Sequence, residues 1–197
     1  DPQYQLLTDN MEVINKKVKD YQDDIIISQK GKLVSKIVKM SMDIVVPDSP
    51  KDEKGNIIDS NFTFKYYRGH YWDNVDLGDD ALVNNPVFHN KLEYFFGDRM
   101  MIQHWDSIIA FAFPFCDQLK QNSKMFEYCV GWITSTFGKS KIMGMDKVYL
   151  EMLNRYYCTE NTQGKSPAYW VSEDKFEDLC DNLKNKLIYS LDMGSLI

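Results

Sequence analysis

The segment FEYCVGWITSTFGKSKIMGMDKVYLEMLNRYY, residues 126–157, holds two apolar patterns of helical period separated by a short polar connection. Apolar side chains recur every three or four residues, first at Phe126, Val130, Ile133 and Phe137 and then at Val148, Met152 and Tyr156. Side chains at this spacing lie on one face of an α-helix, and a short connection favours antiparallel packing of the two helices. The segment therefore predicts an all-α fold.

The same period continues on both sides of this segment. It predicts a helix before it, through Ile108, Ala112, Phe115 and Leu119, and a helix after it, through Phe176, Leu179, Leu183 and Leu187. Pro114 lies inside the earlier pattern and should kink or split that helix, because proline lacks the backbone N–H that a helix needs. Strand signals are weak, although Phe62, Phe64 and Tyr66 alternate with polar residues.

The N-terminal part of the chain predicts a helical hairpin. A narrow apolar seam runs in steps of four and three through Leu7, Met11, Ile14, Val18, Tyr21 and Ile25. This pattern is typical of a long amphipathic helix with one partner. Gly31 ends this helix, and the sequence KLVSKIVKMSM, residues 32–42, predicts a second one. Because the connection is short, we expect the two helices to pack antiparallel.

A long polar loop separates this hairpin from the later helices. It contains Pro47, Pro50 and Gly55 among charged side chains, a composition that prevents regular structure. The predicted organisation is a helical hairpin at 1–45, a surface loop at 46–61 and an irregular stack of antiparallel helices at 62–197.

The composition is typical of a globular protein. Of the 197 residues, 44% are apolar and 26% are charged, which suffices for one sizeable core and argues against disorder. No uncharged run approaches the length that a bilayer requires, so we expect no transmembrane segment. The net charge is −6 and the basic residues form no stripe, which argues against a nucleic-acid partner.

The four cysteines do not form a recognisable motif. Cys116, Cys129, Cys158 and Cys180 lie at least thirteen residues apart and contain no C-x-x-C pair, so neither a redox dithiol nor a zinc knuckle is predicted. Each lies in an apolar helical stretch, where a free thiol behaves as a small apolar side chain. We expect buried, unpaired thiols, and one or two disulfides are the alternative.

No catalytic or metal-binding motif is apparent. His70, His89 and His104 stand fifteen or more residues apart and form no H-E-x-x-H. The aspartates within residues 73–80 lack the spacing of a calcium loop, and Asp79 and Asp80 suit the cap of the short turn that follows. Serine-nucleophile, phosphate-loop and dinucleotide motifs are absent as well. We therefore expect no catalytic residue, no cofactor and no metal ion in this chain.

Aromatic side chains, at 14% of the chain, provide the one candidate binding surface. Rings at Tyr67, Tyr71, Trp72, Tyr94 and Trp170 would line a groove for glycans or peptides. Most of these rings also fit helical apolar stripes, so the same side chains would equally serve as filler in a multi-helix core. The sequence leaves both interpretations open.

Five stretches of the chain, taken in order, resemble a known family. They are KKVKDYQDDII (16–26), DEKGNIIDSNFTFKYYRGHYWDNVDLGDDALVNNPVFHNKLEYFF (52–96), WDSII (105–109), the segment at 126–157 and YWVSEDKFEDLCDNLKNKL (169–187). The most specific parts are Y-Y-x-x-H-Y-W-D-N-V-D at 66–76 and S-K-I-M-G-M-D at 140–146. These stretches resemble a helical domain of unknown function that precedes the catalytic thioredoxin-like domain of exported bacterial thiol-disulfide interchange proteins.

The resemblance implies an exported protein, periplasmic or membrane-anchored through a removed N-terminal signal. This chain would be its non-catalytic accessory module, covalently linked to a thioredoxin-like domain after Ile197. The sequence DMGSLI, residues 192–197, resembles the lead-in to that domain, with Gly194 as its glycine. Residues 111–116 are more aromatic than the corresponding family helix, and the family supplies no catalytic residue for this part.

Two functions follow as expectations. The first is an accessory module that positions a protein or peptide partner against a neighbouring redox site, or that mediates assembly. The second is a stand-alone module that binds glycans or peptides through its aromatic side chains. A third class, a hydrolase, would need a cleft in which a histidine lies near a serine or carboxylate of perturbed pKa.

Overall fold

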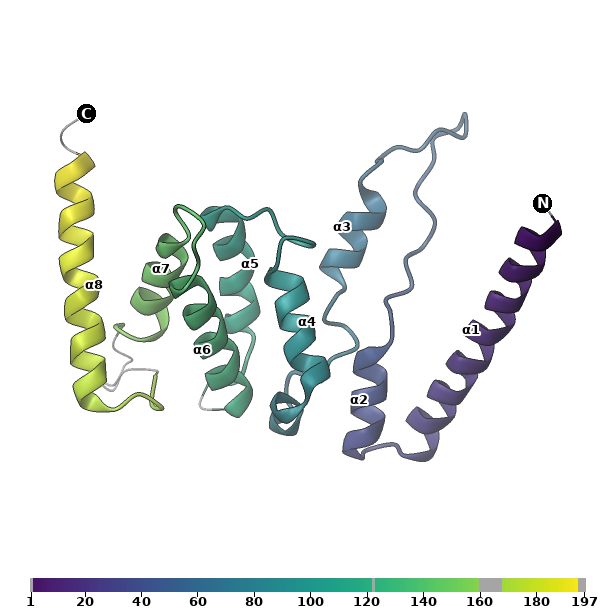
Figure 1. Ribbon diagram of the computed structural model, residues 1–197, viewed down its shortest axis with the longest axis horizontal. Coiled ribbons are helices and arrows are strands. Elements are labelled where there is room, and N and C mark those ends of the chain that lie inside the picture. The colour runs from purple at the N-terminus through teal and green to yellow at the C-terminus, as the bar shows by residue number, and fades with distance from the viewer. Residues whose placement is uncertain (1, 122, 160–167, 195–197) are drawn as a thin grey trace. The chain divides into compact units, whose positions relative to one another are not determined.

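The computed structural model describes residues 2–121, 123–159 and 168–194, and every regular element in these ranges is helical (Figure 1). The elements are α1 (Pro2–Ser28), α2 (Leu33–Ser41), α3 (Phe62–Gly69), η1 (Asp80–Asn84), α4 (Pro86–Phe96), α5 (Trp105–Asp117), α6 (Lys124–Gly138), α7 (Asp146–Tyr156) and α8 (Glu173–Gly194). In these ranges the only β-type pairing is an isolated bridge between Lys51 and Ile57. The all-α prediction is confirmed, and the alternating residues 62–66 belong to α3.

The chain forms two compact units that interleave in sequence. Unit 1 comprises Asp1–Asp76 and Asn84–Phe95, and unit 2 comprises Leu77–Val83 and Phe96–Ile197. Unit 1 therefore holds α1, α2, α3 and nearly all of α4, whereas unit 2 holds α5 to α8. The two units are defined by contacts within the chain. The predicted boundary between domains at residues 46–61 stays a prediction.

In unit 1, α1 and α2 form the predicted hairpin, joined by a turn at Gly31. Gly31 has a φ of 83°, a left-handed conformation that glycine adopts without a steric penalty. Because α2 has 9 residues and α1 has 27, α2 is too short to cover the whole of α1. Ile25 and Ile26 near the turn are partly buried, whereas the apolar side chains further toward the N-terminus are exposed.

Aromatic rings form much of the core of unit 1. Tyr71, two residues after α3, is buried with its ring centroid 5.2 Å from that of Phe95 on α4. The ring of Trp72 lies 5.2 Å from Phe95 and 6.2 Å from Phe88, and Phe88 is fully buried. Burial of such rings is a large apolar contribution to stability. These contacts hold the segment after α3 against α4.

The α6–α7 pair is the centre of unit 2. All seven side chains of the two predicted stripes are buried: Phe126, Val130, Ile133, Phe137, Val148, Met152 and Tyr156. At the end of α6, Gly138 leaves room for the ring of Tyr149 on α7, because a Cβ there would lie 2.8 Å from Tyr149 Cδ2. Both α5 and α8 pack against α7. The helices predicted from these stripes are therefore confirmed.

Helix α5 continues through Pro114 and ends at Asp117, so of the predicted kink or split, the split does not occur. Proline removes one helical hydrogen bond at this position. The two residues that follow it, Phe115 and Cys116, are buried in unit 2. Their burial holds the last turn of the helix in place.

Helix α8 carries the last predicted stripe. Cys180 and Leu183 are buried, and Phe176 and Leu179 are partly buried. The side chain of Leu187 and residues 195–197 of the predicted lead-in lie outside the described residues. None of the helices that the structure describes combines the length and hydropathy needed to cross a bilayer.

Two of the cysteines form a disulfide, which corrects the expectation of four free thiols. Cys158, two residues after α7, is bonded to Cys180 of α8. Cys116 and Cys129 are free and buried, as expected. The paired residues are 22 positions apart, and only the packing of α8 against α7 brings them together.

The first turn of α6 is capped by two side chains. Ser123 Oγ accepts a hydrogen bond from the Phe126 N–H at 3.1 Å, and Asp80 Oδ1 accepts one from the Met125 N–H at 2.9 Å. Of the two aspartates predicted to cap the short turn, Asp79 does so, since its Oδ1 accepts a hydrogen bond from the Ala81 N–H at 3.0 Å, whereas Asp80 caps α6. The N–H groups of a first helical turn have no partner within the helix, so these acceptors stabilise α6.

We expect the substitution Asp80→Ala to lower the free energy of unfolding of unit 2 by about 1 kcal/mol. The Met125 N–H would lose its acceptor, and a negative charge near the helix N-terminus would be removed. Urea denaturation followed by circular dichroism measures the effect. Asp98→Ala, which removes an exposed carboxylate from the same unit, is the control and should change little. Equal stability of the two variants would contradict the capping role of Asp80.

Candidate functional site

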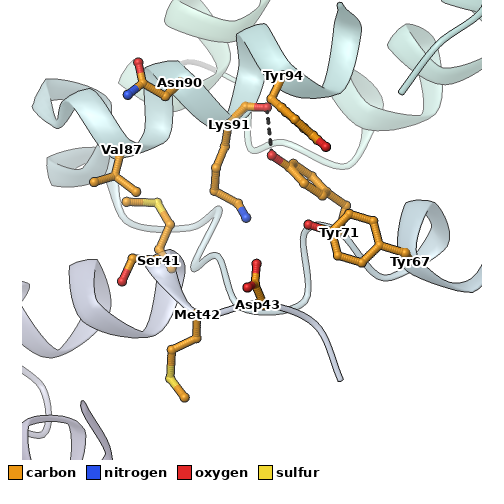
Figure 2. A pocket seen from close by; sticks show the side chains of 10 residues that line it. Ser41, Met42, Asp43, Tyr67, Tyr71, Val87, Asn90, Lys91 and Tyr94 are labelled. Carbon is orange, nitrogen blue, oxygen red and sulfur yellow. Dashed lines mark hydrogen bonds between the residues drawn. The ribbon is translucent and has the colours of Figure 1, made fainter. Parts of the chain in front are cut away.

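A pocket of about 430 Å³ lies in unit 1 between the end of α2, the α3 segment and α4 (Figure 2). It is lined by Met40, Ser41, Met42, Asp43, Tyr67, Tyr71, Val87, Asn90, Lys91 and Tyr94. A volume of this order is typical of sites for small molecules. Three aromatic rings, two opposite charges and one amide therefore converge on one hollow.

Three tyrosines form the aromatic wall of this pocket. Tyr67 lies on α3 and Tyr71 lies one turn further along the chain, with ring centroids 5.8 Å apart in an edge-to-face arrangement. Tyr94 on α4 stacks on Tyr71 with centroids 6.1 Å apart. Tyr71 is buried and donates its hydroxyl to the Lys91 carbonyl at 3.3 Å, whereas Tyr94 is 39% exposed. The wall thus has a fixed inner ring and an outer ring that a ligand can reach.

Lys91 and Asp43 supply opposite charges beside these rings. Lys91 Nζ lies 4.1 Å from the centroid of the Tyr71 ring, a cation–π contact. Figure 2 shows the Lys91 amine and the Asp43 carboxylate pointing toward each other across the pocket. Burial lowers the pKa of Lys91 by removing water from the ammonium group, and the Asp43 carboxylate opposes this effect. A ligand carboxylate near Lys91 would replace part of the lost hydration.

The hydroxyl groups of the lining are suited to binding. Burial raises the pKa values of Tyr71 and Tyr67, and the Asp43 carboxylate raises them further because it repels a phenolate. Both phenols stay neutral at neutral pH; the Tyr67 hydroxyl can donate or accept a hydrogen bond, whereas Tyr71, which already donates to the Lys91 carbonyl, can only accept one. Ser41 Oγ donates to the Val38 carbonyl at 2.7 Å and is held within α2. The lining contains no histidine or cysteine.

Most of the residues that line this pocket lie in the part of the chain that matches a known protein family. A profile described as a domain of unknown function (DUF5106) matches residues 55–181, more than half of the chain. The chain belongs to the DUF5106 family. All three pocket tyrosines and Lys91 fall inside the matched region of this DUF5106 chain, whereas Asp43 and α1 precede it. No curated protein and no solved structure is significantly similar to the chain.

The structure brings together three of the five predicted binding residues of the DUF5106 chain. Tyr67, Tyr71 and Tyr94 line the pocket. Trp72 packs in the core of unit 1, as described above. Trp170 packs edge-on in unit 2, with ring centroids 5.8 Å from Phe126, 5.7 Å from Tyr157 and 5.1 Å from Tyr169. The two tryptophans therefore contribute to packing.

Sequence reasoning missed the charged side chains of the pocket. Lys91 lies three residues before Tyr94, so helical spacing alone would have placed both on one face of α4. No comparable signal exists for Asp43, which follows α2 and reaches the tyrosines only through the fold of unit 1.

Two further hollows of the DUF5106 chain are less suited to a ligand. One of about 400 Å³ in unit 2 is bordered by Asp117, which accepts hydrogen bonds from Arg155 at 2.6 and 3.3 Å and from the Tyr156 hydroxyl at 2.7 Å. A ligand there would have to break this network. The other, of about 490 Å³ in unit 1, shares Met42 and Asp43 with the tyrosine pocket but is lined by none of its three tyrosines.

Two of the histidines of the DUF5106 chain pair locally. His70 Nδ1 lies 2.7 Å from Asp73 Oδ2, and its ring stacks on Tyr66 with centroids 4.1 Å apart. His104 pairs with Asp106, two residues further along the chain. Over residues 2–121, 123–159 and 168–194, no three side chains of the His, Cys, Asp or Glu type gather in a group that could hold a metal ion.

Proposed function

We propose that this DUF5106 chain is a non-catalytic helical module that binds a segment of a protein or peptide partner in its tyrosine pocket. The observation that carries the proposal is the lining of the pocket, in which an exposed ring stacks on a buried one beside Lys91 and Asp43. A peptide offers apolar side chains to the rings and charged or polar groups to the amine and the carboxylate. The rings of the pocket can contact the apolar side chains of such a peptide, and the amine and the carboxylate can bind its charged or polar groups.

The proposal also covers the kind of protein in which the module acts. It would act in an exported thioredoxin-like thiol-disulfide oxidoreductase, beside a covalently linked redox domain, where it positions a substrate segment or mediates assembly. The sequence resemblance to such proteins supports this setting. The Cys158–Cys180 disulfide supports it as well, because structural disulfides persist in oxidising compartments.

Disulfide-reductase assays test this setting. The present chain should not reduce a protein disulfide, because its free thiols, Cys116 and Cys129, are buried and burial raises their pKa values. The longer protein that includes the residues encoded after Ile197 should be active. Reductase activity of the present chain alone, or a gene that encodes no thioredoxin-like domain beyond it, would overturn this part of the proposal.

Tyr94→Ala should weaken peptide binding by roughly tenfold, because it removes the exposed ring that stacks on Tyr71. The fluorescence of Trp72 reports binding, since its ring centroid lies 5.1 Å from that of Tyr71. A library of acidic, basic and aromatic peptides is titrated against the native chain first, and the tightest binder is then used with the variants.

A matched control for Tyr94 exists in the same unit. Phe64 on α3 is 44% exposed, close to the 39% of Tyr94, but does not line the pocket. Phe64→Ala should therefore leave the peptide affinity unchanged. Equal losses in both variants, or no saturable signal with any peptide, would contradict the binding role of the pocket.

A second candidate function is a stand-alone glycan-binding module. The exposed face of Tyr94 favours it, because sugar rings stack on exposed aromatic side chains. Titration of the same fluorescence signal with a panel of glycans separates the two functions. A saturable change with a glycan, together with none with peptides, would select this second function.

A further inference from the structure

The N-terminal part of α1 presents a continuous apolar seam to solvent. Its six positions are Tyr4, Leu7, Met11, Ile14, Val18 and Tyr21, and each of these side chains is between 50% and 72% exposed. The next position of the repeat, Ile25, is partly buried near the turn to α2. In α6 and α7 the corresponding apolar stripes are buried. The exposed seam therefore needs an explanation that the rest of the fold does not give.

The spacing of the seam selects a helix as its partner. The positions are separated by three, four, three, four and three residues, which is the 3.5-residue repeat of a two-stranded coiled coil. Over this span of 18 residues a helix is about 27 Å long. A short docking segment would need only three or four anchors, whereas six consecutive layers fit a helix of similar length and the same repeat.

The seam is also symmetric, so a second copy of the same helix is a complementary partner for it. Its steps are the same when read from either end, so an antiparallel copy places an apolar side chain opposite each apolar side chain. Met11 then faces Ile14 of the other copy, and Leu7 faces Val18. Such a pairing is isologous, because both copies contribute the same surface. We propose that α1 pairs with α1 of a second copy of this chain as an antiparallel two-stranded coiled coil.

The residues beside the seam are compatible with this register. Lys17 faces Asn10 of the other copy, and Thr8 faces Asn15, so no like charges meet. The antiparallel direction also places the two hairpin turns, and the α2 helices that follow them, at opposite ends of the pair. A parallel pair would bring both α2 helices to the same end.

The size of the seam is sufficient for a specific dimer. Six side chains that are at least half exposed in each of two copies bury roughly 1,000–1,500 Å² of accessible surface when they pair, which approaches the area of standard specific interfaces. Burial on this scale supports dissociation constants in the micromolar range or below. We therefore expect a dimer that dissociates on dilution.

Sedimentation equilibrium of the full chain across the micromolar range tests the proposal. The expected result is a mass that rises with concentration from the 23.1 kDa of one chain to twice that value. Ile14→Asp places two charges in the central layers of each dimer and should raise the dimer Kd by roughly a hundredfold or more. Thermal unfolding at low concentration should be unchanged in this variant, because Ile14 is exposed in the single chain.

Val13→Asp is the matched control. Val13 is 54% exposed, against 57% for Ile14, and lies next to it in the sequence but off the seam. The same charge at this position should leave the dimer Kd within a few-fold of the native value. A chain that stays monomeric throughout, or a dimer that survives Ile14→Asp, would overturn the proposal.

Charge variants at Asn10 test the direction of the pair. In the antiparallel register Asn10→Glu faces Lys17 twice in each dimer and should tighten it several-fold, whereas Asn10→Lys should weaken it by a similar factor. In a parallel pair, residue 10 would face the uncharged Asn15, so neither substitution would move the Kd much. Equal Kd values for the two variants would exclude the antiparallel arrangement.

Discussion

Phe126→Ala is expected to destabilise unit 2 by about 3–5 kcal/mol. Phe126 is among the largest fully enclosed side chains of the described residues, and its ring lies 5.9 Å from Tyr156 and 5.8 Å from Trp170, edge-on to both. Removal of the ring leaves a cavity that the neighbouring aromatic side chains cannot fill, since each is held by other contacts. Urea denaturation, followed by circular dichroism and by tryptophan fluorescence, measures the loss.

Met143→Ala is the control for this variant. Met143 lies in the same unit and is 99% exposed, so its truncation removes apolar atoms that are in contact with water in the folded chain. The free energy of unfolding should change by less than about 0.5 kcal/mol. A comparable loss in both variants, or a loss below about 1 kcal/mol for Phe126→Ala, would contradict the central position of Phe126 in the core.

The helices of unit 2 could be predicted from the sequence because their signal is local. Phe126 and Val130, or Val148 and Met152, lie one turn apart, and burial of such pairs requires only that the segment be helical and packed. The seam of α1 has the same local signal, and it predicted the helix correctly. It did not show that α2 would leave the seam exposed, because that outcome depends on the length of α2.

The pocket could be predicted only in part. The sequence prediction grouped Tyr71 with Trp72 because both are aromatic and adjacent in sequence. In the structure the two side chains have different surroundings. Whether a ring lines a hollow or fills a core depends on which helix packs against it, and single-sequence spacing carries no such information. The same reason explains why Asp43 was missed, since its place beside the tyrosines is set by the path of the chain after α2.

The cysteines illustrate the same limit for a covalent bond. Apolar surroundings were a sound basis for predicting that Cys116 and Cys129 are buried and free. The same argument failed for Cys158 and Cys180, because an apolar stretch can hold either a thiol or a disulfide. Only the position of α8 against α7 distinguishes the two cases.

Replacement of both Cys158 and Cys180 by serine is expected to lower the free energy of unfolding of unit 2 by about 3 kcal/mol. The disulfide closes a loop between residues 22 positions apart and thereby restricts the unfolded chain. It also anchors α8, in which Cys180 and Leu183 are the buried side chains among those described. Hydrogen exchange in the first half of α8 should therefore accelerate in the variant, and the loss of stability should be seen in urea denaturation.

Reduction of the native chain provides an independent measurement of the same bond. A mild reductant should lower the unfolding midpoint of the native chain toward that of the double serine variant, and should leave the variant itself unchanged. Thiol titration of the unfolded, unreduced chain should detect two free thiols, because Cys116 and Cys129 are unpaired. Detection of four thiols, or identical midpoints with and without reductant, would show that α8 is held to α7 by side-chain packing alone.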